Sequence, residues 1–115
     1  MKKLTWHIHF YSDRVAKDMD KLPAGILADF IDLLDQVEVH GPNLGEPHTK
    51  PMGCGLYELR ANGSEGIGRG LFCSVKGNHV VILHVFQKKT QKTSKRDLDL
   101  GYKRMKEVQH GKLKL

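Results

Sequence analysis

Apolar and polar residues alternate at the start of the chain, from residue 4 to residue 10, which predicts a strand with one buried face. The apolar positions are Leu4, Trp6, Ile8 and Phe10. His7 and His9 share the polar face. No third metal ligand stands nearby in the sequence, so we interpret this face as solvated and predict no metal site.

The next stretch has the three- and four-residue apolar spacing of two helices. Ser12 is a suitable N-cap for a short helix that ends at about Lys21. Pro23 is a suitable first residue for a longer helix, which Gly41 and Pro42 end. The buried face of this longer helix is predicted to consist of Ile26, Leu27, Phe30, Ile31, Leu33, Leu34 and Val37. Residues 41–54 are then predicted to form a loop.

Three strands separated by glycine turns are predicted next, at residues 55–61, 67–76 and 79–86. Residues 80–85 are almost all apolar and mostly β-branched, which is typical of a strand buried on both faces. Gly77-Asn78 favours a hairpin between the last two strands. Gly68 and Gly70 flank Arg69, and we expect them to let a ligand approach the backbone closely. Arg69 itself is expected near an exposed edge.

A basic helix is predicted to close the chain, with Thr93 or Ser94 as its cap and its end at about Gln109. The resulting order is β-α-α-β-β-β-α, which predicts an α+β fold. A chain of 115 residues is long enough for one modest core, so we expect one domain spanning residues 1–115.

The net charge of +6 is unevenly distributed along the chain. Residues 88–115 contain ten Lys/Arg and three Asp/Glu, whereas residues 1–87 contain nine and ten. The excess positive charge therefore follows the last strand. This asymmetry favours a nucleic-acid or anionic-surface partner slightly over a helix that is merely solvated.

Three features bear on where the protein works. Cys54 and Cys73 are too few for a disulfide framework and lack a C-x-x-C spacing, which favours free thiols in a reducing compartment. Lys2-Lys3 precedes alternating residues instead of an apolar run, so we expect no signal peptide. No apolar run has the length of a transmembrane helix. We therefore expect a cytoplasmic protein that makes no membrane contact.

Four cations are expected to meet on one region of the sheet. Arg60 and Arg69 lie on neighbouring predicted strands, and Lys88 and Lys89 follow the third. Because like charges repel, a bound polyanion is the natural reason for such a cluster.

The string L-Y-E-L-R at residues 56–60, the arginine-bearing strand after it, and V-I-L-H-V-F-Q-K-K-T-Q-K-T-S-K-R at residues 81–96 resemble the RelE/HigB superfamily of toxin–antitoxin toxins. The likeness is greatest to the HigB-like, phage-derived Gp49-like subgroup. It implies a RelE-like fold: a small twisted antiparallel sheet, two N-terminal helices on one face and a basic C-terminal helix. It also implies an endoribonuclease that uses no cofactor and cleaves mRNA in the ribosomal A site. The implied partner is a cognate antitoxin, often a helix-turn-helix protein.

The resemblance also suggests roles for residues matched by position. Arg69 matches the arginine beside the scissile phosphate, and Arg60 matches the arginine that closes the L-R motif. Lys88 and Lys89 match the basic pair at the end of the last strand. Glu58 stands where some relatives have lysine, which leaves the general base unassigned.

Cleavage of this kind begins when the ribose 2′-OH attacks the adjacent phosphate, and negative charge then gathers on the phosphorane oxygens. Arg69, with Lys89 as a second clamp, is expected to stabilise that charge. The candidate bases are Glu58, Lys88 and His84, and either lysine can act as the acid.

Each candidate base also has a plainer interpretation. Glu58 can simply pair with a neighbouring arginine, and a histidine such as His84 inside an apolar strand is more often a satisfied core residue. Lys50, in the predicted loop, is a possible RNA contact. Lys92 and Lys95 are expected to contact backbone phosphates without sequence choice.

Two other functions are compatible with this scaffold. A ParE-like protein inhibits DNA gyrase without cleaving RNA, and a non-catalytic module binds RNA or the ribosome only. Cleavage of messages that depends on Arg69 separates the first hypothesis from both.

Overall fold

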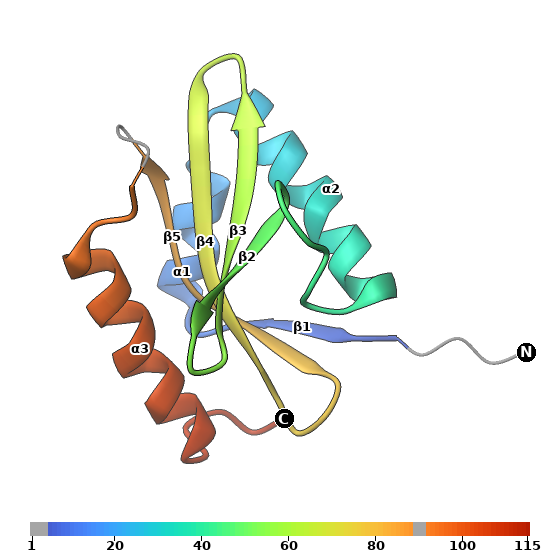
Figure 1. Cartoon of the computed structure of the whole chain (residues 1–115), viewed down its shortest axis with the longest axis vertical. Helices are drawn as coiled ribbons and strands as arrows, with labels where there is room; N and C mark the ends of the chain where they lie inside the picture. Colours follow the sequence, from blue (N-terminus) through green and yellow to red (C-terminus); the bar gives the residue numbers. More distant parts are fainter. Residues whose placement is uncertain (1–4, 89–91) are drawn as a thin grey trace, which may run out of the picture.

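The fold is seen in a computed structural model, which describes residues 5–88 and 92–115. Within these ranges the chain forms five strands and three helices in the order β-α-α-β-β-β-β-α (Figure 1). Their bounds are β1 His7–Phe10, α1 Asp13–Asp20, α2 Ala24–His40, β2 Thr49–Gly53, β3 Leu56–Gly63, β4 Gly66–Val75, β5 His79–Lys88 and α3 Lys95–Gln109. The predicted α+β class is confirmed. Of the first predicted strand, Leu4 lies outside the described residues.

All five strands belong to one sheet, in the order β1-β5-β4-β3-β2. β3, β4 and β5 are consecutive antiparallel neighbours, as predicted. The sheet is mixed, however, because β1 pairs with β5 in the parallel direction, with His7 opposite His79. A parallel pair needs a long crossover instead of a tight turn. Here the chain between the two strands contains α1, α2 and the other three strands.

The end of the predicted loop at residues 41–54 is an edge strand. β2 covers Thr49–Gly53 and pairs with β3 so that Lys50 lies opposite Glu58. β2 contains Pro51, and proline within a sheet is confined mainly to edge strands because it cannot donate to a ladder. An edge strand tolerates proline, because only one of its sides is paired.

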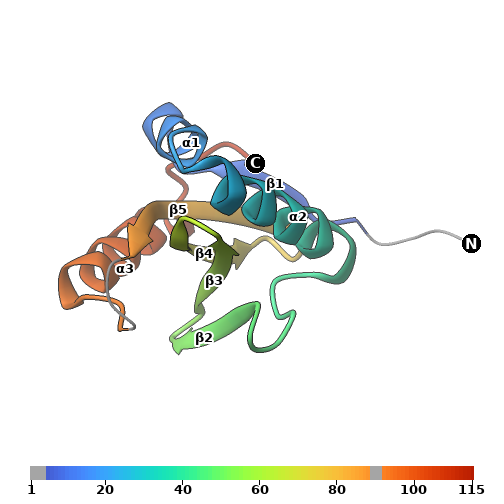
Figure 2. The ribbon, with the colours of Figure 1, turned by 90° about the horizontal axis from the view of Figure 1, so that it is seen from above.

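The sheet separates two apolar layers (Figure 2). α1 and α2 cover one face, where Phe30 and Phe72 lie fully buried. α3 covers the other face, where Leu71 and Met105 lie in the second cluster. Because side chains alternate across a strand, each charged residue can be assigned to one of the two layers.

Gly68 and Gly70 serve helix packing, contrary to the predicted role in ligand approach. Gly70 lies opposite Leu59 in the β3–β4 register and faces α2. A Cβ at Gly70 would lie 2.5 Å from the Phe30 ring, and a Cβ at Gly68 would lie 2.5 Å from an Ile26 methyl carbon. The two glycines therefore let α2 lie close against the sheet, while Arg69 between them points the other way.

The predicted serine caps of α1 and α3 are confirmed. Ser12 accepts a hydrogen bond from the Val15 backbone N–H at the start of α1, and Ser94 does the same for Asp97 at the start of α3. Pro23 occupies the cap position of α2 instead of its first turn.

Within residues 5–88 and 92–115, no helix combines the length and the apolar character needed to cross a bilayer.

Candidate functional site

The strand register brings the predicted charged residues together on the α3 face of the sheet. Arg60 lies opposite Arg69, and Arg69 lies opposite Phe86. Glu58 lies opposite Leu71 in the row beside them, and Lys88 lies at the end of β5. Three of the four predicted cations therefore meet in one region, while the fourth, Lys89, lies outside the described residues.

Glu58 is the centre of this cluster. Its side chain is fully buried, and its Oε1 accepts a hydrogen bond of 3.1 Å from Arg60 Nε. Arg69 Nε lies 3.5 Å from the same oxygen, and Glu58 Oε2 accepts a hydrogen bond from the Thr93 hydroxyl. The ion pairs foreseen as the plainer interpretation of Glu58 are thus present.

Arg69 is buried, with 5% of its surface exposed, and does not lie at the expected exposed edge. The reason is that β4 is the middle strand of five. Its guanidinium donates to the Gly68 carbonyl at 3.2 Å. In the described part of the chain, its Nε is the single buried side-chain polar atom without a hydrogen-bond partner. Burial lowers the pKa of Arg69, the Glu58 carboxylate raises it, and Arg60 lowers it.

Lys88 is also buried, at the last position of β5, and its Nζ donates to Thr93 Oγ1 at 3.4 Å. Burial lowers the pKa of Lys88 below its usual value. Among its charged neighbours, Glu58 raises that pKa, and Arg69 and Arg60 lower it. A lysine in this setting gives up its proton more readily than one in water.

A pocket of about 170 Å³ opens beside Glu58. Its lining residues are Lys50, Met52, Glu58, Arg60, Lys92, Thr93 and Leu98. They come from β2, β3, the segment before α3 and α3 itself. Lys92 is exposed and Arg60 and Lys50 are half-buried, so cations are accessible at the rim.

His84 and Lys95 do not line this pocket, and each has an acidic partner. His84 Nε2 lies 2.8 Å from Asp97 Oδ1. Asp97 is held in turn by Ser94, whose hydroxyl donates to Asp97 Oδ2 at 2.6 Å. Lys95, which is exposed, pairs with Asp99 at 2.9 Å. The arrangement of His84 agrees with the interpretation as a satisfied histidine.

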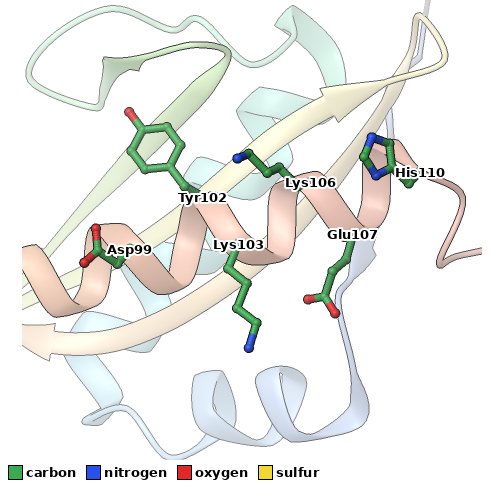
Figure 3. Close-up of a pocket in the computed structure, with 6 residues that line it drawn as sticks. All are labelled: Asp99, Tyr102, Lys103, Lys106, Glu107 and His110. Atoms are coloured by element: carbon green, nitrogen blue, oxygen red, sulfur yellow. The ribbon is translucent and has the colours of Figure 1, made fainter.

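A larger hollow of about 570 Å³ lies along α3 (Figure 3). Its lining residues are Asp99, Tyr102, Lys103, Lys106, Glu107 and His110. In Figure 3 the Lys103 and Glu107 side chains point away from Tyr102 and Lys106, so the charged groups do not converge. The smaller pocket is the better candidate site, because Glu58 and Arg60 meet there.

A third histidine joins His7 and His9, which the sequence did not suggest. His79 of β5 lies beside both, with ring centroids at 5.2 Å from His7 and 5.1 Å from His9. Within the described ranges, no group of three His, Cys, Asp or Glu residues is arranged to hold a metal ion. Burial, His79 and His7 lower the pKa of His9. Only the parallel β1–β5 pairing creates this trio.

Thr93 is the site residue that the sequence analysis missed. In the sequence it is only a possible cap, whereas Ser94 caps α3 in the structure. Thr93 is buried and contacts both Glu58 and Lys88. An isolated threonine in a connecting segment has no periodic pattern, so its position became visible only in the structure.

Comparison with protein families places this arrangement in a known group. The family model described as Phage derived protein Gp49-like (DUF891) matches residues 17–106 of the 115. The chain belongs to the Gp49-like family. The match runs from α1 into α3 and therefore includes Glu58, Arg60, Arg69 and Lys88.

The Gp49-like family is a RelE-like toxin family associated with toxin–antitoxin systems. Membership implies a cognate antitoxin as partner. A search of curated proteins found no match.

Proposed function

We propose that this chain is the HigB-like toxin of a toxin–antitoxin pair and that it cleaves messenger RNA on the ribosome. The observation that carries the proposal is one cluster with a marked excess of positive charge. Arg60, Arg69 and Lys88 surround the Glu58 carboxylate, beside a pocket with Lys50 and Lys92 in its lining. An RNA backbone is the anion that best matches such a surface.

The accessible and the buried cations have different roles in this proposal. Arg60 and Lys92 line the pocket, so they contact the phosphate groups directly. Arg69 and Lys88 lie beneath them and add positive potential, which is stronger away from water. Arg69 is proposed to stabilise the phosphorane through its charge, and Lys89 is proposed as a second clamp.

The proton steps follow from the same contacts. A base removes the 2′-proton, the 2′-oxygen forms a bond to phosphorus, the bond to the 5′-oxygen breaks, and an acid protonates that oxygen. Glu58 is proposed as the base, because it is the carboxylate in the lining of this pocket. Lys88 is proposed as the acid, since a lysine with a lowered pKa donates its proton more easily. The products are a 2′,3′-cyclic phosphate and a 5′-OH.

Other basic residues are proposed to bind RNA without choosing its sequence. Lys50 and Lys92 at the pocket are the first of these, and Lys95 contributes less because Asp99 partly neutralises it. The antitoxin is proposed to be a small helix-turn-helix protein. The toxin acts in the cytoplasm, where ribosomes translate messages.

The test is primer extension on cellular messages after induction of the toxin. Wild type is expected to give discrete cuts inside translated regions. Arg60→Ala and Lys89→Ala should reduce the cuts about 100- to 1,000-fold, because each removes a donor to the transition state. Lys17→Ala on the exposed surface of α1 is the matched control and should cut like wild type.

Arg69→Ala needs a second measurement, since Arg69 is buried and its loss affects stability as well. Thermal unfolding of the purified variant separates a folded, inactive protein from an unfolded one, and Arg69→Lys keeps the charge.

Intact messages with wild type, together with DNA-damage signalling, would favour a gyrase inhibitor. Growth arrest that survives Arg60→Ala and Lys89→Ala without any cuts would favour a binding module.

A further inference from the structure

Thr93 occupies a position that joins the two proposed proton-transfer groups. Its hydroxyl donates to Glu58 Oε2 and accepts from Lys88 Nζ at 3.4 Å. The residue lies in the connection between β5 and α3, directly before the Ser94 cap. A hydroxyl is suited to this place because it can donate one hydrogen bond and accept another.

We propose that Thr93 is a positioning residue of the RNA-cleaving site, whose hydroxyl fixes the orientation of the Glu58 carboxylate and of the Lys88 ammonium. This inference rests on the proposed function. Thr93 touches the pocket, but its proposed contribution is made through the two residues it binds.

Burial is the first argument for a specific role. Thr93 is 6% exposed, and it lies between a fully buried carboxylate and a buried ammonium. A buried ion that loses a hydrogen-bond partner has no water to replace it. The Thr93 hydroxyl therefore holds both groups in fixed positions, whereas an apolar side chain of the same shape leaves each without this partner.

Competition for Glu58 is the second argument. Arg60 holds Oε1 from the pocket side, and Arg69 lies 3.5 Å from the same atom. The Thr93 hydroxyl donates to the other oxygen, Oε2, and without it the carboxylate loses this restraint against rotation toward the two arginines. The rotation would change the direction in which Glu58 accepts a proton, with little effect on how tightly RNA binds at the rim.

The charged groups that face Lys88 determine how pH enters the test. They are Glu58 and Arg60 on β3, Arg69 on β4 and Asp97 on α3. A hydroxyl that accepts from an ammonium favours the charged form. Removal of the Thr93 hydroxyl therefore lowers the pKa of Lys88, and the alkaline limb of the pH–rate profile moves to lower pH.

The experiment measures cleavage of messenger RNA on programmed ribosomes with wild type, Thr93→Val and Thr93→Ser. Thr93→Val is expected to lower the rate at saturating toxin about 10- to 100-fold, as the loss of hydrogen bonds to charged groups predicts. The toxin concentration at half-maximal rate should change less than about threefold. Thr93→Ser keeps the hydroxyl and should retain most of the rate.

Thr49→Val is the matched control. Thr49 is likewise buried, its hydroxyl accepts from the Gly45 backbone N–H at 3.1 Å, and it lies opposite Leu59 of the α2-side core. The Thr49→Val variant should lose stability, but the alkaline limb of its pH–rate profile should not shift. If Thr93→Val does not fold, Thr93→Ala replaces it in the comparison with Thr93→Ser.

The outcomes keep the two hypotheses apart. No cleavage by folded wild type on programmed ribosomes overturns the proposed function. Cleavage by wild type, together with equal rates for the variants with and without the hydroxyl, overturns the role of Thr93 alone. An unchanged alkaline limb, or a loss seen only in half-maximal concentration, also overturns it.

Discussion

Glu58 determines whether the charged cluster is stable. It is fully buried, and both Arg60 and Arg69 lie close to its Oε1. A buried cation without a counter-charge is costly, because the interior does not replace the lost hydration. The same residue therefore stabilises the fold and is proposed as the base.

Glu58→Gln is expected to destabilise the protein by about 3–5 kcal/mol, because it removes the buried carboxylate that faces Arg69 and Lys88. Urea unfolding at pH 7 measures the change. Glu46→Gln is the control: Glu46 also pairs with Arg60, at 3.4 Å, but it is exposed. Its loss should cost less than about 0.5 kcal/mol. Equal costs for the two variants would mean that the cluster is not held by Glu58.

The contact between α2 and the sheet depends on small residues in β4. Gly68 and Gly70 leave room for side chains of α2, and the alternation of the strand then directs Arg69 to the opposite face. The packing of one element thus fixes the side on which the charged cluster forms.

Gly70→Ala is expected to destabilise the protein by about 1–3 kcal/mol, since the added methyl group overlaps the Phe30 ring. Thermal and urea unfolding measure the loss. Ser74→Ala changes an exposed position of the same strand and should stay within about 0.5 kcal/mol of wild type. A Gly70→Ala protein as stable as wild type would contradict the role of this glycine in helix packing.

Periodic patterns predicted most of these elements. The helices and β3, β4 and β5 were found because their apolar spacing is regular, and the caps of α1 and α3 followed from serine chemistry. β2 was missed, because a strand containing Pro51 is possible only at an edge, and edge position is a property of the whole sheet. The parallel direction of β1 depends on a partner far along the chain.

The candidate site was predicted in part. The register of β3 and β4 brought Arg60 and Arg69 together as expected. The burial of Arg69 was not foreseen, since it depends on how α3 and the neighbouring strands enclose it. The predicted role of Gly70 in ligand approach was wrong, because the packing of α2 on the sheet is not visible in the sequence. Once the register is known, its place opposite Leu59 indicates that it faces α2.

The charges of the whole molecule are divided between its two sides. Acidic residues line the outer side of α2, whereas the basic excess lies in residues 88–115, which include α3. A polyanion is therefore attracted toward the α3 side during approach. The pocket beside Glu58 opens on this side.

Lys92→Gln is expected to weaken binding of a single-stranded RNA oligonucleotide and to reduce the salt dependence of log Kd by about 0.7, the value for one phosphate contact. Fluorescence anisotropy over a series of KCl concentrations measures both. Lys17→Gln on α1 removes the same charge from the other side and should leave the slope unchanged. Equal slopes for the two variants would mean that total charge, and not the pocket, attracts RNA.

The pairing of β1 with β5 has a consequence for synthesis. β5 is flanked by β1 on one side and β4 on the other, and it ends at Lys88. During translation β1 cannot pair until β5 has left the ribosomal exit tunnel. β1 therefore has no neighbouring strand through most of synthesis. A product that terminates before β5 lacks the strand that joins β1 to β4, together with the cations of β5 and α3.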